Sequence, residues 1–302
     1  MSFKSGYISL IGLPNVGKST LMNQLLKERL SIVTNKPQTT RKRVLGILTS
    51  VESQMIFLDT PGILTPNYLM QEKLLDFVSL SVKDADILLI LVDVSIDLTG
   101  SKTLENATLI EILNNPRKKK ILVINKIDLS NEEVVTTLVK KAEDTKFFDA
   151  IIPASSLISY NIEKIEETLV QFLPEGPKYY PDDQLTSEPE RFFVAELIRE
   201  KIFENYKDEI PYSTEVIIEE FKERENRKDF ISASIIVERE SQKPIIIGKG
   251  GEGIKKIGQS ARTAIEAFLM RPVYLEIHVK VKKNWRSDPV SLKNFGYDLS
   301  SN

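Results

Sequence analysis

The sequence predicts an α/β domain, with a mostly parallel sheet covered by helices on both faces, followed by a smaller α+β domain. One observation is a glycine-rich loop at residues 12–20, which stands between an apolar run and a helical pattern. Another is the alternation of strand-like and helix-like segments up to residue 172, which is typical of a parallel sheet. A third is a second glycine-rich loop at residues 248–251, surrounded by helical and strand patterns. A length of 302 residues also exceeds one typical domain.

Composition narrows the class of protein before any motif is considered. The sequence has no cysteine, which excludes disulfides and thiolate metal sites. No stretch approaches the ~20 apolar residues of a membrane helix, and the first residues lack the apolar run of a signal peptide, so we expect a cytoplasmic protein. From residue 230 onward there are 12 Lys and Arg against 7 Asp and Glu, whereas the preceding part is acidic. That asymmetry favours a nucleic-acid-binding module near the C-terminus.

The first glycine loop has the pattern Gly-x-x-x-x-Gly-Lys-Ser and predicts a site for nucleotide phosphates. It follows a predicted strand at residues 7–11 and precedes a helix, so backbone N–H groups and the helix dipole both face the phosphates. Lys18 is expected to reach the β- and γ-phosphates, and the Ser19 hydroxyl to bind Mg²⁺. The predicted nucleotide-binding residues of this loop are Gly12, Asn15, Val16, Gly17, Lys18, Ser19 and Thr20.

The other elements of the first domain follow from apolar periodicity. Fully apolar runs such as residues 87–92 predict strands buried on both faces of a parallel sheet. Residues 30–41 are polar and contain a proline, which favours a loop. Further strands are expected at 44–49, 54–58, 121–124 and 150–153, and helices at 68–82, 102–114, 131–145 and 161–172.

Polar motifs follow the ends of several predicted strands, where parallel sheets bind ligands. Asp59 begins an Asp-x-x-Gly motif; its carboxylate can hold Mg²⁺ through water, and Gly62 leaves room for a backbone N–H to meet the γ-phosphate. An Asn-Lys-x-Asp motif follows the strand at 121–124. Its aspartate can accept two hydrogen bonds from guanine, and adenine would leave that carboxylate unpaired. The predicted base-binding residues are Asn125, Lys126, Asp128, Ser155 and Ser156, the serines acting through a backbone N–H.

A proline- and glycine-rich stretch separates the two domains. We expect a nucleotide-binding domain at residues 1–175, a linker at 176–190, and a second domain with a C-terminal tail at 191–302. In the second domain the pattern predicts a helix from about residue 190, strands at 214–221 and 230–237, a glycine loop, a helix to about residue 270 and a strand at 273–281.

The second glycine loop, Gly-Lys-Gly-Gly, precedes a helix and predicts a contact with a nucleic-acid backbone. Glycines allow close approach, and the N–H groups of the helix end can meet phosphates. The element order, with the Gly-x-x-Gly loop before the second helix, resembles a type II KH domain, which implies single-stranded RNA as the ligand. The predicted RNA-binding residues are Gly248, Lys249, Gly250, Gly251, Lys255, Lys256 and Arg262.

Residues 7–172 resemble a translation-factor-class P-loop GTPase, and the whole chain is similar to the Era family of ribosome-assembly GTPases. The resemblance rests on Gly-x-Pro-Asn-x-Gly-Lys-Ser-Thr, Pro-Gln-Thr-Thr-Arg, Asp-Thr-Pro-Gly and Asn-Lys-x-Asp, followed by the KH-like domain. It implies that GTP and Mg²⁺ are bound, with Thr40 as the switch threonine that closes over the metal and Thr39 as the alternative. Ile63 occupies the position of the catalytic glutamine of Ras-like enzymes, so slow intrinsic hydrolysis is expected. The residues expected to act in catalysis are Asn15, Lys18, Thr40 and Gly62.

The same resemblance implies the cation and the partners. Asn15 is the candidate ligand for potassium, since related GTPases with an Asn at that position use this ion. The partners implied are small-subunit ribosomal RNA near its 3′ end and the small ribosomal subunit during maturation. A monomer, and peripheral association with the inner face of the cell membrane, are further expectations. Two alternatives stay open: a GTPase that serves RNA modification, and a GTPase whose KH-like module binds protein.

Overall fold

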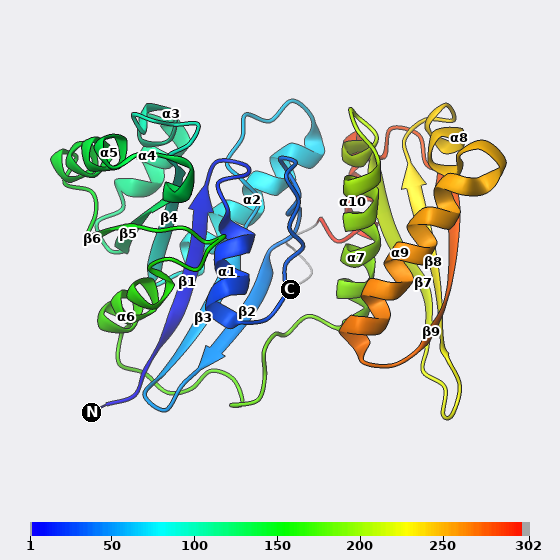
Figure 1. Ribbon diagram of the computed structural model, residues 1–302, viewed down its shortest axis with the longest axis horizontal. Coiled ribbons are helices and arrows are strands. Elements are labelled where there is room, and N and C mark those ends of the chain that lie inside the picture. The colour runs from blue at the N-terminus through cyan, green and yellow to red at the C-terminus, as the bar shows by residue number, and fades with distance from the viewer. Residues whose placement is uncertain (1, 298–302) are drawn as a thin grey trace. The chain divides into compact units, whose positions relative to one another are not determined.

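The computed structural model describes residues 2–297 and divides the chain into two compact units (Figure 1). The first unit consists of Met1–Thr65 and Leu74–Ser187. The second consists of Pro66–Lys73 and Glu188–Asn302. Within the described residues, no helix is both long enough and apolar enough to cross a membrane.

The first unit is built on a six-stranded sheet in the order β2-β3-β1-β4-β5-β6. All neighbours are parallel except β2 and β3, which form an antiparallel pair at one edge. The central strand β4 is apolar and completely buried, because helices cover both faces of the sheet. The strands are β1 (Lys4–Gly12), β2 (Val44–Thr49), β3 (Ser53–Asp59), β4 (Ile87–Asp93), β5 (Lys119–Asn125) and β6 (Ala150–Pro153).

The helices of the first unit confirm the sequence prediction except in one place. The apolar pattern at residues 102–114 predicted one helix, but the structure has two short ones. The break occurs because the Asn106 side chain accepts a hydrogen bond from Leu109 N and caps a new helix. The α-helices are α1 (Lys18–Leu26), α2 (Leu69–Asp84, which belongs to this unit from Leu74 onward), α3 (Ser101–Leu104), α4 (Ala107–Leu113), α5 (Glu132–Asp144) and α6 (Ile162–Phe172), with the 3₁₀ turn η1 (Ile127–Leu129).

Part of the predicted linker is bound to the first unit as a strap, which we define as residues 174–186. Its backbone meets buried Gln54, whose Oε1 accepts hydrogen bonds from Tyr179 N at 2.7 Å and Tyr180 N at 3.0 Å. Further along, Ile47 N donates to Leu185 O at 2.8 Å. The strap therefore follows the outer strand β2, and the division between the units falls after Ser187, inside the expected linker.

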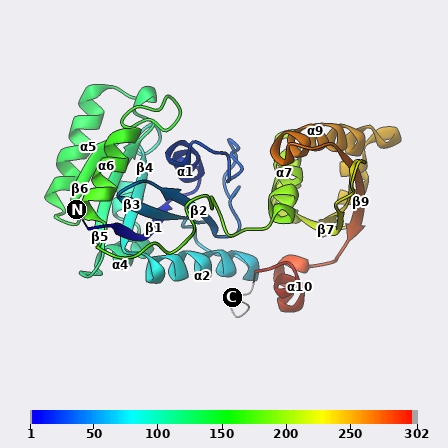
Figure 2. The same cartoon turned by 90° about the horizontal axis from the view of Figure 1, so that it is seen from below.

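The second unit contains a three-stranded sheet in the order β7-β8-β9. β7 (Thr214–Lys222) and β8 (Asp229–Val237) form the expected antiparallel hairpin, and β9 (Val273–Val281) runs parallel to β8. Two helices pack against one face of this sheet, α7 (Glu190–Asn205) and α9 (Glu252–Leu269) (Figure 2). This arrangement is the type II KH topology that the sequence predicted.

Short elements complete the second unit, and the sequence did not reveal all of them. The apolar stretch before the glycine loop forms a helix, α8 (Gln242–Ile247), which the sequence pattern did not predict. Its short length and its proline conceal the helical periodicity. The remaining elements are η2 (Pro211–Ser213), η3 (Lys249–Gly251), η4 (Trp285–Ser287) and α10 (Pro289–Asn294).

Candidate nucleotide-binding and RNA-binding sites

The first glycine loop connects β1 to α1 and forms one wall of a cleft. Gly17 has a φ of 98°, and a Cβ there would lie 2.4 Å from Asn125 Nδ2, so only glycine fits. Lys18 is buried, and its Nζ donates to the carbonyl oxygens of Gly12 at 3.3 Å and Leu13 at 3.1 Å. Burial lowers the pKa of Lys18 to about 8, partly offset by the Asp59 carboxylate. The loop thus presents an ammonium group that phosphates could solvate in place of backbone carbonyls.

Three oxygen-bearing side chains converge beside this lysine. Ser19 Oγ donates to Asp59 Oδ2 at 2.6 Å and lies 2.8 Å from Thr40 Oγ1. Asp59 is fully buried, and its Oδ1 has no hydrogen-bond partner among the described residues. Burial raises the pKa of Asp59, although Ser19 and Lys18 lower it. A buried carboxylate oxygen without a partner, next to two hydroxyl groups, suits a hard divalent cation such as Mg²⁺.

The structure separates the two candidate threonines of the first switch. Thr40 faces Ser19, as the 2.8 Å distance between their hydroxyl oxygens shows. Thr39 is turned into its own loop, where its Oγ1 donates to Lys36 O at 2.8 Å and lies 2.6 Å from Thr34 Oγ1. Of the pair, only Thr40 lies beside the Ser19 and Asp59 oxygens.

The Asp-x-x-Gly segment lies against the phosphate loop. A Cβ on Gly62 would lie 2.6 Å from the N and Cα atoms of Pro14, so the two backbones touch closely at this glycine. Ile63 N donates to Gly12 O at 3.0 Å, and its side chain is buried in the apolar core. Ile63 therefore points away from the cleft, and its side chain takes no part in positioning water.

The base-reading residues come together at the carboxyl ends of β5 and β6. Asn125 Nδ2 donates to Val16 O at 2.8 Å, which ties this motif to the phosphate loop. The Ser156 N–H and hydroxyl both donate to Asn125 Oδ1 at 3.0 Å, and Ser155 N donates to Tyr160 O. The serine N–H groups expected to meet guanine are thus already paired within the protein. The Asp128 carboxylate, in contrast, is exposed and has no partner among the described residues.

Lys126 makes two contacts that the sequence did not predict. Its Nζ lies 2.6 Å from Asp93 Oδ2 and donates to Asn15 O at 2.9 Å. Asp93 is the last residue of β4 and is almost fully buried. Its position at a strand end, one strand away from the Asn-Lys-x-Asp motif, was the only signal that could have identified it.

The second glycine loop is open on its outer side. Gly250 and Gly251 both have positive φ angles, and a Cβ on either would meet no atom within 4 Å. Gly248 differs, because a Cβ there would lie 2.7 Å from Gly253 N at the start of α9. Gly248 therefore serves the local fold, whereas Gly250 and Gly251 leave free space over the N-terminal end of α9. Lys249, which lies between Gly248 and Gly250, is exposed.

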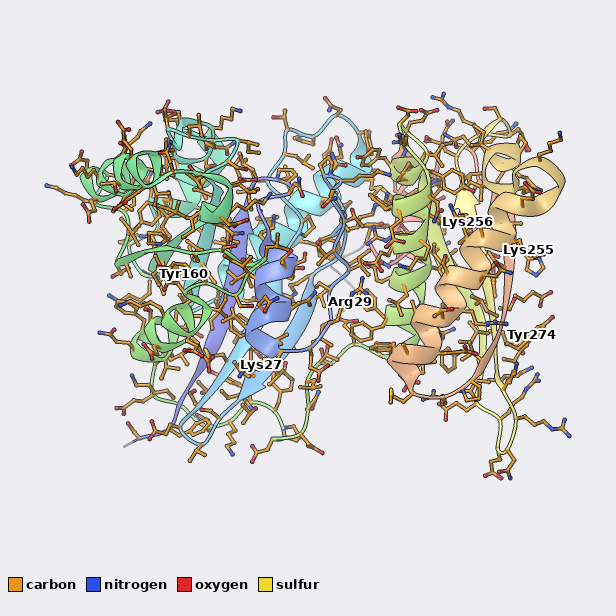
Figure 3. The ribbon with its side chains drawn as sticks, viewed as in Figure 1. Lys27, Arg29, Tyr160, Lys255, Lys256 and Tyr274 are labelled. Atoms are coloured by element: carbon orange, nitrogen blue, oxygen red, sulfur yellow. The ribbon has the colours of Figure 1, made fainter. Side chains whose placement is uncertain are left out.

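A groove of about 310 Å³ lies between α9 and β9. Apolar side chains from both elements line it together with the cationic Lys255 and Arg262, a combination that suits unstacked bases with phosphates at the rim. Lys256 also comes from α9 (Figure 3), but it is not among the residues that line the groove. The sequence missed the apolar lining because helix and strand contribute it jointly. The groove is lined by Ile254, Lys255, Gly258, Gln259, Arg262, Leu275 and Ile277.

These features define a P-loop GTPase joined to a KH domain. Family models agree with both halves: "50S ribosome-binding GTPase" matches residues 7–126, and "KH domain" matches residues 209–286. The chain is 44% identical to GTPase Era of Geotalea uraniireducens, over 98% of both chains. It is 43% identical to the chloroplastic GTPase ERA-like protein of Arabidopsis thaliana, over 97% of this chain and 69% of the relative. The chain belongs to the Era family of GTPases.

Solved structures of relatives agree with the whole fold. An Era variant from Aquifex aeolicus bound to GDP and AlF₄⁻ is 38% identical, with a TM-score of 0.90 over 98% of this chain and all of that one. Another Era structure contains MgGDPNP and nucleotides 1506–1542 of 16S ribosomal RNA. It is 39% identical, with a TM-score of 0.91 over 98% of this chain and all of that chain.

Proposed function

We propose that this protein is a GTP-hydrolysing switch that binds small-subunit ribosomal RNA near its 3′ end and assists maturation of the small ribosomal subunit. The observation that supports the nucleotide-binding part of this proposal is the convergence of Ser19, Thr40 and Asp59 beside Lys18. For the RNA half, support comes from the groove at α9 and from the relative whose structure contains 16S ribosomal RNA.

In this proposal the nucleotide lies across the carboxyl edge of the sheet. Lys18 and the N–H groups of its loop neutralise the phosphates, and Ser19, Thr40 and Asp59 hold Mg²⁺, which would shield the charge on the β- and γ-phosphates. Asp128 reads the guanine, because its carboxylate is exposed and unpaired. Ser156 meets the guanine carbonyl only if its N–H is shared with Asn125.

The base-reading role is tested with Asp128→Asn. An amide presents a donor where the carboxylate accepts, so preference should shift from guanine toward xanthine nucleotides. Competition of GTP and XTP for the same site measures the change. Unchanged guanine preference would remove Asp128 from base recognition.

The RNA-binding role is tested with two variants of one glycine. Asn and Asp have the same shape and both tolerate the left-handed backbone of Gly250, but Asp places a negative charge where we expect a phosphate. Gly250→Asp should weaken binding of a 16S 3′-end RNA at least tenfold more than Gly250→Asn, with GTP hydrolysis in the absence of RNA unchanged in both. Equal affinity of the two variants would argue that this loop does not contact RNA, and would favour the alternative of a protein-binding KH module.

Potassium is a further part of the proposal. Asn15 is exposed at the mouth of the cleft and adopts a left-handed φ of 65°. Because Ile63 is buried, another group has to stabilise charge during hydrolysis, and a cation held at Asn15 could do so. Single-turnover hydrolysis should be faster in potassium than in sodium, and Asn15→Ala should abolish the difference. Equal rates in the two salts would remove the cation from the mechanism.

The remaining parts of the proposal concern the setting. We propose a cytoplasmic monomer with peripheral contact to the membrane, expectations that rest on the family resemblance. Service to RNA modification is not favoured, since the sites described hold no second catalytic constellation. Crosslinking the protein to RNA in cells and sequencing the fragments would identify the RNA that it binds.

A further inference from the structure

We infer that Asp93 is a positioning residue that holds nucleotide in the site by fixing Lys126 against the phosphate loop. The inference rests on the nucleotide-binding role proposed above for residues 125–128. It adds a residue that lies outside all four GTPase sequence motifs. Three observations support it. They are the two contacts of the Lys126 ammonium group, the different partners of the two Asp93 carboxylate oxygens, and the backbone pairing and φ angles of the residues involved.

The Lys126 ammonium group joins two separate parts of the site. It lies 2.6 Å from Asp93 Oδ2 and donates to the backbone oxygen of Asn15 at 2.9 Å. An ammonium group has three donors, so these two contacts determine where the end of the side chain lies. The stem between Lys126 Cα and the ammonium group is thereby stretched toward the phosphate loop, where it can cover one face of a bound base.

The Asp93 carboxylate is oriented for this contact. Its Oδ1 accepts hydrogen bonds from Ser95 N at 3.0 Å and Ser95 Oγ at 2.5 Å, which leaves Oδ2 for Lys126. The side chain of Asp93 is only 2% exposed, whereas that of Lys126 is 25% exposed. Because the carboxylate is shielded from water and held by two donors, the ion pair is stronger than an ordinary surface pair.

Backbone pairing places this carboxylate beside the base-reading motif. Asp93 and Asn125 are register partners at the carboxyl ends of the parallel strands β4 and β5, which lie next to each other (Figure 1). Val94 N donates to Asn125 O at 3.1 Å just beyond them. The carboxylate is therefore held at a fixed place on the sheet, and its contact with Lys126 restrains the phosphate loop, to which Lys126 also donates a hydrogen bond.

Lys126 and Asn15, which one of these hydrogen bonds connects, both have left-handed backbones. Lys126 has a φ of 63°, a left-handed value that a lysine adopts at a cost, and Asn15 has a φ of 65°, which asparagine tolerates more easily. Such conformations persist where surrounding contacts enforce them. The contacts Asp93–Lys126–Asn15 supply that enforcement, and they connect the residues expected at the base to the residues expected at the phosphates. Loss of the Asp93 charge should let the two loops separate and release nucleotide faster.

The test measures release of fluorescent mant-GDP from the full chain. Asp93→Asn keeps the shape but removes the charge, and it should accelerate release at least tenfold, the scale of one charge-assisted hydrogen bond. Lys126→Met removes the ammonium group and keeps a long apolar stem. In the Lys126→Met background, Asp93→Asn should change release less than twofold, because the partner through which it acts is gone.

Asp97 provides a matched control on the same loop. It is buried and accepts hydrogen bonds from Lys102 N, Thr103 N and Thr103 Oγ1, contacts that only shape the loop and the start of α3. Asp97→Asn should lower the melting temperature of the nucleotide-free protein while changing release less than twofold. Asp93→Asn should also accelerate the release of mant-IDP and the release of mant-GDP by the same factor. The inosine base differs from guanine only in lacking the amino group expected to face Asp128, and Asp93 acts through Lys126 and not through that group.

The inference is overturned if Asp93→Asn releases mant-GDP at the wild-type rate, if Asp97→Asn accelerates release equally, or if Asp93→Asn still accelerates release without the Lys126 ammonium group. These results differ from a failure of the proposed function. A wild-type protein that binds mant-GDP no better than an adenine nucleotide would overturn the guanine-binding proposal itself.

Discussion

At the scale of single residues, the candidate metal site of Ser19, Thr40 and Asp59 shows how much depends on which way one side chain points. Thr39 and Thr40 are adjacent and chemically identical, yet only Thr40 lies beside Ser19, at 2.8 Å. Thr39 is satisfied inside its loop by Lys36 O and Thr34. The sequence contained both hydroxyl groups, and the loop backbone decided between them.

The two threonines make a matched pair for mutation. Thr40→Ala should slow single-turnover GTP hydrolysis roughly 10- to 100-fold and raise the Mg²⁺ concentration required, because it removes the hydroxyl that we propose as a metal ligand. Thr39→Ala should change the rate less than about threefold, since it loosens only the loop. Hydrolysis rates over a Mg²⁺ titration compare the two variants. A larger effect at Thr39 would reverse the assignment of the ligand.

At the scale of elements, one arginine joins three parts of the KH unit. Arg271, in the turn between α9 and β9, donates from Nε to Asp229 Oδ2 at 2.5 Å and from Nη1 to Glu190 Oε1 at 3.1 Å. Asp229 begins β8 and Glu190 begins α7. Burial raises the pKa of Asp229, but hydrogen bonds from the Arg271 side chain and the Arg224 backbone outweigh it and lower the pKa below the usual range.

This arginine contact predicts a pH-dependent stability. A lowered pKa means that Asp229 stabilises the folded unit above its unfolded pKa of about 3.9, and that the contribution is lost as pH falls through its folded pKa. Asp229→Asn should cost about 1 kcal/mol at pH 7, or roughly 5 °C in melting temperature, because Arg271 is partly exposed. The difference from wild type should be constant near neutral pH, begin to shrink as the pH falls below the unfolded pKa, and keep shrinking as the pH falls through the lowered folded pKa.

The control for this prediction uses the same arginine. Glu223 lies 3.9 Å from Arg271 and is largely exposed, so Glu223→Gln should leave the melting temperature unchanged at every pH. Calorimetry between pH 3 and pH 7 follows all three proteins. A melting difference for Asp229→Asn that stayed constant down to pH 3 would show that the carboxylate charge is not its source.

At the scale of the whole molecule, the proposed switch requires that nucleotide and RNA influence each other. In the proposed switch, GTP and Mg²⁺ would hold the loop of Thr40 and the Asp59–Gly62 segment, and hydrolysis would release them. We expect this ordering to expose or cover the RNA groove. Affinity for a 16S 3′-end RNA should therefore differ at least fivefold between the complexes with GDP and with GDPNP.

Thermodynamic linkage provides an internal check of this prediction, because the coupling between nucleotide and RNA can be measured from either ligand. RNA must change the ratio of the affinities for GDPNP and GDP by the same factor as the nucleotides change the affinity for RNA. Fluorescence titrations of each ligand in the presence of the other measure both factors. Gly250→Asp, whose RNA binding should be weakened, should show little effect of RNA on nucleotide affinity at RNA concentrations that saturate the wild type. Equal RNA affinity with GDP and GDPNP would contradict the switch.

The sequence by itself determined the two folds and the family, and it identified most of the candidate site residues. Phosphate loops, strand-end carboxylates and glycine turns are local patterns, because each depends on neighbours within a few residues. Apolar periodicity likewise located nearly every long helix and strand, but it predicted one helix where Asn106 caps a second one, and it missed the short helix α8.

Only the tertiary structure decided which distant groups meet. Gln54 binds the strap, Leu275 lines the groove beside Lys255, and Asp93 reaches Lys126, although each pair of partners is separated by many residues. Such contacts depend on strand order and register, which bring together the ends of segments that carry no shared pattern. A local sequence pattern can specify what a residue could do, but the sheet that holds it determines what it contacts.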